Sequence, residues 1–178
     1  MTTVTEKFCF PQSNIIISGT PGVGKSHLSA KLAEKFNYQI HDISKIASEK
    51  GFVDEYDEEY NCPILNEDKI IDYLDPILKT GGHIVEYHGC DFFPERFFDA
   101  VFVVRCNNTI LYDRLKERNY NEKKLKSNIE CEIFQTILEE AQDSYKEDII
   151  FEVKGETPKD TAEAMKVAKD WYKVWSRK

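Results

Sequence analysis

Residues 19–26, read as GTPGVGKS, match the pattern G-x-x-x-x-G-K-[ST] in full. Glycines at these positions let the backbone curl around a phosphate with its N–H groups pointing inward, where a side chain would collide with the anion. A helix that follows would present its unpaired N-terminal N–H groups to the same anion. Lys25 would then neutralise the β and γ oxygens, and the Ser26 hydroxyl would join the shell of a bound Mg²⁺. The segment predicts a cradle for a nucleoside triphosphate.

An acid and a histidine stand two residues apart at the end of the apolar segment 83–87. If this segment is a strand, Glu86 and His88 face the same side, at the edge where open α/β sheets bind their ligands. Glu86 could hold Mg²⁺ through a water molecule, and His88 could orient a nucleophile or a phosphoryl group. Spacing alone leaves a second interpretation of His88 open, namely a hydrogen-bonded structural histidine.

Two arginines, Arg114 and Arg118, lie one helical turn apart. Such a pair could clamp a transferring phosphoryl group and stabilise its spreading negative charge. Salt bridges on the protein surface are the alternative, and the spacing does not choose between them.

The elements that position these residues alternate between strands and helices. Short apolar or β-branched runs predict strands at residues 14–18, 38–41, 83–87, 100–104 and 149–153. Helical spacing of apolar residues predicts six helices: from Lys25 to about Phe36, from 43 to Gly51, from Asn66 onward, at 109–118, at 127–145, and from Thr157-Pro158 onward. Asp42 or Ser44 would cap the second of these helices, and Asn66 would cap the third, which has Pro76 in its last turn. This pattern indicates one α/β domain, residues 1–178, with a parallel sheet flanked by helices.

Two segments are interpreted by their composition. Residues 54–60, DEYDEEY, are too acidic for a core and are expected to form an exposed loop. Trp171 and Trp175 extend the apolar stripe of the last predicted helix, and we expect them to pack in the core.

The charge balance limits the class of partner. The chain carries 24 Lys and Arg against 32 Asp and Glu, a formal charge of -8, which disfavours a protein that coats nucleic acid. Any contact with RNA would be local or made through a partner. The acidic surface suits a basic protein partner, although the alternative is that the net charge only keeps the protein soluble. Scattered cysteines, and the lack of a secretory signal or a membrane-sized apolar run, lead us to expect a protein of the nucleus and cytoplasm.

Three longer segments, YDEEYNCPILNEDK (56–69), YHGCDFFPERFFD (87–99) and RNYNEKKLKSNIECEIF (118–134), add to GTPGVGKS. Together they resemble the adenylate kinase isoenzyme 6 family over nearly the whole chain. The resemblance implies a P-loop NTPase fold of the adenylate kinase type, with a region that binds a nucleoside monophosphate (about 42–65) and a short lid (about 117–127). It implies roles in catalysis for Lys25, His88 and Arg118, in Mg²⁺ binding for Ser26 and Glu86, and in ATP binding for Gly22, Val23, Gly24, Lys25, Ser26, His27 and Arg118.

The resemblance also implies an activity and partners. Family members transfer phosphate from ATP to AMP, hydrolyse ATP, and bind the basic small-subunit ribosomal protein uS11 on the pre-ribosomal particle during maturation of 18S rRNA. We expect a monomer with ATP and Mg²⁺ as cofactors. Two positions depart from the family pattern: Ser48 stands where relatives have arginine or lysine, which should weaken AMP binding, and Glu86 stands where aspartate is common, which shifts the carboxylate by about 1 Å.

Three functional hypotheses therefore remain at this point. The first is an AMP kinase with ATPase activity that serves assembly of the small ribosomal subunit. The second is a nucleotide-gated assembly factor in which ATP binding switches the grip on a ribosomal protein and AMP kinase activity is slight. The third is a small-metabolite kinase of the shikimate or gluconate type, which would share the cradle but not the long motifs.

Overall fold

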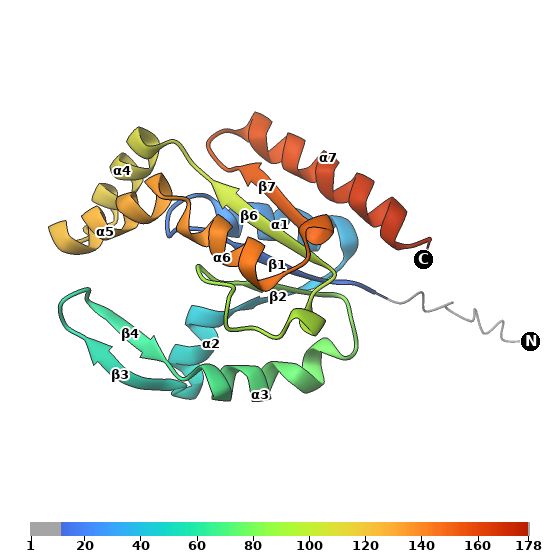
Figure 1. The fold of residues 1–178 in the computed structure, drawn as a ribbon, viewed down its shortest axis with the longest axis horizontal. Helices are drawn as coiled ribbons and strands as arrows, with labels where there is room; N and C mark the ends of the chain where they lie inside the picture. The colour runs from blue at the N-terminus through green and yellow to red at the C-terminus, as the bar shows by residue number, and fades with distance from the viewer. Residues whose placement is uncertain (1–11, 178) are drawn as a thin grey trace, which may run out of the picture.

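A computed structural model describes residues 12–177 of the chain. Its centre is a parallel five-stranded sheet with the strand order β2-β5-β1-β6-β7 (Figure 1). All neighbouring strands run in the same direction, which confirms the predicted α/β class. The strands are β1 (Asn14–Ser18), β2 (Gln39–Asp42), β5 (His83–Glu86), β6 (Ala100–Arg105) and β7 (Ile150–Lys154).

Helices cover both faces of this sheet, because alternate residues of the central strand point to opposite sides. Ile15 and Ile17 of β1 pack with helices α1, α4 and α7, whereas Ile16 packs with α2, α3 and α6. All three isoleucines are fully buried. The helices are α1 (Lys25–Phe36), α2 (Ile43–Lys50), α3 (Glu67–Leu78), α4 (Asn108–Glu117), α5 (Glu122–Ile133), α6 (Thr136–Ser144) and α7 (Pro158–Trp175), with short 3₁₀ helices at Glu95–Phe97 and Glu147–Ile149.

The register of the strands sets the edge where side chains gather. Glu86 at the end of β5 pairs with Ile17 of β1 on one side and with Asp42 of β2 on the other. The loop that follows β1 therefore emerges beside two carboxylates. Strands β2 and β5 lie on one side of β1, and strands β6 and β7 lie on the other. The strand order therefore reverses at β1, and open parallel sheets bind their ligands at such switch points.

Three of the predicted helix starts, at Asp42, Asn66 and Thr157, are confirmed. Asp42 accepts a hydrogen bond from the backbone N–H of Lys45 and caps α2, and Asn66 caps α3 in the same way. Thr157 opens α7 with a capping box closed by Asp160. Pro76 lies within the last turn of α3, which ends at Leu78.

The expectation that both tryptophans pack in the core is confirmed only for Trp171, which is partly buried against the core, whereas Trp175 is half-buried beside it and donates through Nε1 to Asp99. Trp171 meets the rings of Phe102 and Phe151, and Trp175 lies beside Trp171.

Residues 54–60 were expected to form an exposed loop, which is wrong for residues 54–57, where the chain forms a strand, whereas residues 58–60 form a turn. They belong to a two-stranded antiparallel hairpin, β3 (Val53–Asp57) and β4 (Cys62–Leu65), that stands apart from the main sheet (Figure 1). Most of its side chains are exposed, as their acidity required. The hairpin is stabilised by backbone pairing between its strands and not by burial of side chains. Asn61, at a φ of 48°, lies in the turn.

The single helix expected at 127–145 is two helices, and it begins earlier than predicted. Asn121 caps α5, which ends at Ile133, and α6 starts after Gln135, whose φ of 57° breaks the helical path. The break leaves Ile133 and Phe134 exposed. The apolar spacing that predicted one continuous helix therefore included residues that do not face the core. Within residues 12–177, no helix is long and apolar enough to cross a membrane.

Candidate active site

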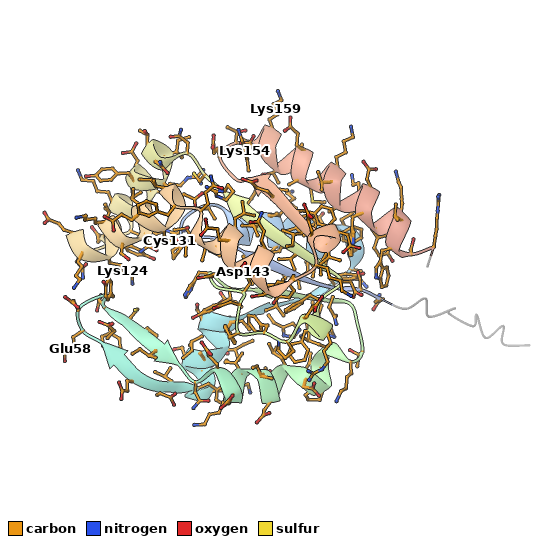
Figure 2. The ribbon with its side chains drawn as sticks, viewed as in Figure 1. Glu58, Lys124, Cys131, Asp143, Lys154 and Lys159 are labelled. Carbon is orange, nitrogen blue, oxygen red and sulfur yellow. The ribbon has the colours of Figure 1, made fainter. Side chains whose placement is uncertain are left out.

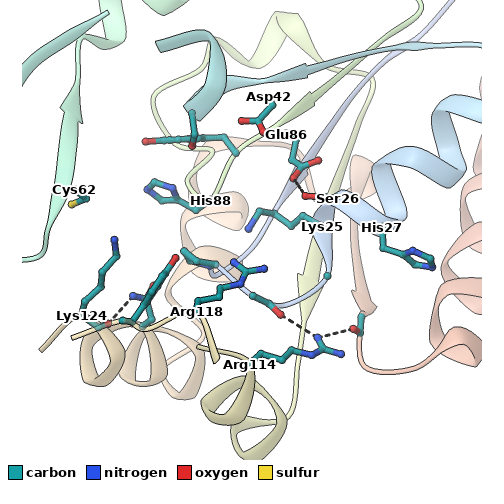
Figure 3. Close-up of a pocket in the computed structure, with 18 of the residues that line it drawn as sticks. Lys25, Ser26, His27, Asp42, Cys62, Glu86, His88, Arg114, Arg118 and Lys124 are labelled. Atoms are coloured by element: carbon teal, nitrogen blue, oxygen red, sulfur yellow. Dashed lines mark hydrogen bonds between the residues drawn. The ribbon is translucent and has the colours of Figure 1, made fainter. Parts of the chain in front are cut away.

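A cavity of about 1010 Å³ opens at the carboxyl edge of the sheet (Figure 3). Its floor is the loop after β1 together with the first two residues of α1, a segment that we call the P-loop (residues 19–26). One wall comes from β2, the β3–β4 hairpin and the start of α3, and the opposite wall from α4 and α5. The segment between β7 and α7 closes a third side. The volume is at the upper end of the range for small-molecule sites.

The P-loop needs its glycines for conformation and for space. Gly24 has a φ of 108°, and a Cβ atom there would lie 2.8 Å from the carbonyl oxygen of Gly155. Gly19 has a φ of 145°, and a Cβ atom there would lie 2.5 Å from the carbonyl oxygen of Val104. Helix α1 begins directly after Gly24, so its first N–H groups have no partner within the helix and face the cradle. This geometry suits a bound phosphate.

Lys25 extends across the cradle. Its Nζ donates hydrogen bonds to the carbonyl oxygens of Gly19 at 2.7 Å and Thr20 at 3.1 Å. Burial lowers the pKa of Lys25 from 10.5 to about 8, although the carboxylates of Glu86 and Asp42 oppose the shift. The lysine is therefore a cation poised for an anionic ligand, because a phosphate would favour its charged form.

Ser26 and Glu86 meet where the sequence predicted a metal site. The Ser26 hydroxyl donates to Oε1 of Glu86 over 2.5 Å, and Glu86 is nearly buried at the end of β5. Hydroxyl and carboxylate oxygens beside a triphosphate cradle are the ligands that Mg²⁺ prefers. Residues 12–177 contain no cluster of three or more His, Cys, Asp or Glu that could hold a metal.

His88 lies across the cavity from Arg118, and Figure 3 draws its imidazole on the side of Cys62. Enclosure by protein lowers its pKa to about 4, and the positive charges of Lys25 and Lys124 add to the shift. The ring is therefore neutral near pH 7. The alternative of a hydrogen-bonded structural histidine finds no partner for the ring among residues 12–177, whereas the backbone oxygen of His88 accepts a hydrogen bond from Ser18 Oγ at 2.7 Å.

The two arginines do different things, and neither makes a salt bridge within the described chain. Arg114 donates to three backbone oxygens, those of Gly22 at 3.1 Å, Gly155 at 3.0 Å and Glu156 at 2.9 Å. It therefore ties the P-loop to the segment after β7, a role that neither of the two interpretations of this pair, phosphate clamp or surface salt bridge, had included. Arg118 points into the cavity toward Lys25 (Figure 3), and its side chain has no hydrogen-bond partner in residues 12–177.

The remaining predicted contacts lie in the loop itself. Gly22 lines the cavity, whereas the side chain of Val23 is fully buried in the core, so Val23 faces a ligand only with its backbone. The ring of His27 is directed away from Lys25 (Figure 3), which leaves its backbone N–H at the start of α1 as the group nearest the cradle.

The wall opposite the arginines is acidic. Asp42 and Glu67 line it together with Glu86, and within the described chain no Lys or Arg from residues 42–65 lines the cavity. Ser48 is exposed outside the lining, as are Lys45 and Lys50. Sequence reasoning missed Asp42 as a site residue, although its place just after the predicted strand 38–41 was a signal.

Sequence reasoning also missed the segment after β7. Residues Gly155, Glu156, Thr157, Pro158 and Thr161 line the side of the cavity next to the P-loop. The same rule that selected Glu86, the carboxyl end of a predicted parallel strand, applied to these residues as well.

The hairpin tip and α5 meet over the mouth of the cavity. Lys123 forms an ion pair with Glu59, and Lys124 Nζ donates to the backbone oxygen of Asn61 over 3.1 Å. Figure 2 labels Lys124 and Glu58 on the two sides of this opening. The region predicted to bind a monophosphate thus touches the predicted lid, and both assignments stay predictions.

Comparison with known sequences gives consistent results. A family model described as an AAA domain matches residues 15–135. The chain is 65% identical over 165 residues to the adenylate kinase isoenzyme 6 homolog of Drosophila melanogaster, covering 93% of this chain and 94% of the fly protein. The homolog of Caenorhabditis elegans is 50% identical over 146 residues, covering 81% of this chain and 80% of the worm protein.

Comparison with solved structures shows the fold. Shikimate kinase from Bacteroides thetaiotaomicron superposes with a TM-score of 0.58 at 15% identity, over 90% of this chain and 98% of that one. A gluconokinase from Sinorhizobium meliloti gives a TM-score of 0.53 at 18% identity, over 94% and 98%. At these identities the likeness extends to the architecture alone, a P-loop kinase fold with a five-stranded parallel sheet.

Proposed function

The chain belongs to the adenylate kinase isoenzyme 6 family, and from this premise we propose that it transfers the γ-phosphate of ATP to AMP, forming two ADP. Membership of this family makes it a P-loop nucleotide kinase that binds ATP. The observation that carries the finer proposal is the convergence of Lys25, Glu86 and Arg118 on one cavity, above the P-loop and opposite a second wall that has room for an acceptor.

The residues divide the work of an in-line transfer, in which positioning and charge stabilisation matter more than covalent chemistry. Lys25 moves from the carbonyl oxygens of Gly19 and Thr20 to the phosphates and neutralises their charge. Ser26 and Glu86 would hold Mg²⁺, which would supply positive charge that offsets the charge of the phosphates. Arg118 closes over the transferred group, and the neutral ring of His88 supports the acceptor geometry. Contact between the hairpin and α5 covers part of the cavity mouth and would limit, without abolishing, the access of water to the reacting group.

A second candidate, ATP hydrolysis by a nucleotide-gated assembly factor, has its own support. The acceptor wall carries Asp42 and Glu67 rather than an arginine, and Ser48 lies outside it. Carboxylates repel a monophosphate but leave room for a water nucleophile. We therefore propose that hydrolysis accompanies transfer to AMP.

The cellular role follows the family as a further proposal. The acidic hairpin and the charge of -8 suit the basic ribosomal protein uS11 as a partner on the pre-ribosomal particle, where the enzyme would act in maturation of the small subunit. Contact with RNA would be local or indirect, and the protein would work as a monomer in nucleus and cytoplasm.

A coupled assay of ADP formation tests the activity. With MgATP alone the protein should form ADP slowly, and addition of AMP should raise the rate strongly. The Lys25→Ala variant should lose both activities by at least about 100-fold, the size of effect seen when a group that stabilises transition-state charge is removed.

Lys31→Ala is the matched control, because Lys31 is an exposed lysine on the same helix with only a distant partner in Glu34. Full activity in Lys25→Ala would exclude this site. ADP formation indifferent to AMP, but altered by a basic ribosomal protein, would favour the second candidate over the first.

A further inference from the structure

Glu132, near the end of α5, is a buried carboxylate that the proposed mechanism does not use. Only 3% of its surface is exposed, although α5 lies at the rim of the molecule. We propose that Glu132 is a positioning residue that fixes the P-loop and, through it, Lys25. This inference rests on the proposed phosphoryl transfer and names a further residue that supports it.

Both carboxylate oxygens of Glu132 are engaged. Oε1 accepts hydrogen bonds from Arg105 Nε at 2.6 Å and from the backbone N–H of Cys106 at 3.1 Å. Oε2 accepts from the hydroxyl of Thr20 at 2.8 Å. Arg105 also donates through Nη2 to the backbone oxygen of Glu132 at 3.0 Å, so the end of α5 is held to the end of β6 by side chain and backbone together.

Thr20 carries the effect into the phosphate site. It is the second residue of the P-loop, is fully buried, and its carbonyl oxygen accepts a hydrogen bond from Lys25 Nζ. A continuous path therefore runs from Arg105 through Glu132 and Thr20 to Lys25. Buried ion pairs add little net stability by themselves, so a role in holding geometry explains the arrangement better than a role in folding alone.

Helix α5 connects Glu132 to the cavity wall and to the hairpin as well. Lys124 and Asn128 line the cavity from the same helix, and its first turn contacts the hairpin tip. Glu132 pins the other end of the helix to the P-loop. The cavity wall formed by α5 and the P-loop are thereby held in a fixed relative position, and Glu132 makes the contact between them.

Two conservative variants test the role. Thr20→Val keeps the size of the side chain and removes its hydroxyl, and Glu132→Gln keeps the size and removes the charge. Each should lower kcat for ATP-dependent transfer by about tenfold, as expected for loss of a hydrogen bond to a charged group, while KM for AMP stays within about twofold. The double variant should be no slower than the slower single variant, because both act on one unit.

Glu152→Gln is the matched control. Glu152 pairs with the same arginine, at 3.2 Å from Arg105 Nη1, but its side chain is 53% exposed and does not reach the P-loop. This variant should keep wild-type kcat. Backbone amide spectra without nucleotide add a readout that is independent of activity: resonances of residues 19–26 should shift in Thr20→Val and stay in place in Glu152→Gln.

The outcomes separate this inference from the proposed function. A wild-type protein that forms no ADP contradicts the proposed function, whatever the variants do. An active wild type whose Thr20→Val and Glu132→Gln variants lose only melting temperature, with kcat and the P-loop amides unchanged, overturns the positioning role alone. Additive losses in the double variant would overturn it as well.

Discussion

The lowered pKa of Lys25 predicts how the affinity for MgATP depends on pH. In the free protein, burial holds this pKa at about 8, with Glu86 and Asp42 only partly opposing the shift. A bound triphosphate favours the charged lysine and raises its pKa. The affinity for MgATP should therefore be highest below the pKa that Lys25 has in the free protein. It should fall as the pH rises through that pKa, because binding must then take up a proton.

The magnitude follows from the free pKa. With a pKa of about 8, the protonated fraction of Lys25 is about 0.9 at about pH 7 and about 0.1 at about pH 9. The dissociation constant of MgATP should rise about tenfold over that interval, or about 1.4 kcal/mol. Calorimetric titrations in two buffers of different ionisation enthalpy would show uptake of nearly one proton at the higher pH and little at the lower.

Lys25→Met supplies the control, because it removes the titrating group. Its affinity should be weak and nearly flat over the same interval. His88 should add no inflection above about pH 6, since its pKa is about 4. A wild-type affinity that does not change between the two pH values, with no proton uptake, would refute the assignment of Lys25 as a buried cation that meets the phosphates.

Three further substitutions have expected outcomes. Glu86→Gln removes the carboxylate that accepts from Ser26 and should lower kcat by about 10 to 100-fold, with a higher Mg²⁺ concentration for half-maximal rate in a metal titration. Arg114→Lys replaces three hydrogen bonds to backbone oxygens with one point charge and should lower the melting temperature by about 5 °C in calorimetry, together with ATP affinity; an unchanged protein would argue against the tie between P-loop and β7. Gly24→Ala places a Cβ atom 2.8 Å from the oxygen of Gly155 at a left-handed φ, so denaturant unfolding should show a loss of about 1 to 3 kcal/mol, with ATP binding abolished.

The sequence predicted the parts of the fold that burial controls. The run at residues 15–17 is apolar because both faces of β1 are covered, and the step from Leu28 to Leu32 follows one buried stripe of α1. The P-loop was readable because phosphate binding restricts its residue types as well as their spacing. Glu86 was found by its place at a strand end.

The rest depended on interactions that leave no periodic signal. Acidic residues at 54–60 hid a hairpin, because backbone pairing orders it without an apolar face. Gln135 breaks a helix at a positive φ where sequence rules look for glycine. The roles of Arg114 and Glu132 rest on contacts with residues far away in the chain, which a single sequence does not reveal.

The ion pair between Glu59 and Lys123 has a consequence for any protein that grips the hairpin tip. One carboxylate cannot satisfy two cations fully, so a basic partner at Glu59 competes with Lys123 and weakens the hold of the hairpin on the start of α5, which then rests on the hydrogen bond from Lys124 to Asn61. Linkage makes the competition mutual: whatever draws α5 onto the hairpin loosens the partner by the same factor. An exposed pair is worth up to about 1 kcal/mol, so this contact could bias release by up to about fivefold.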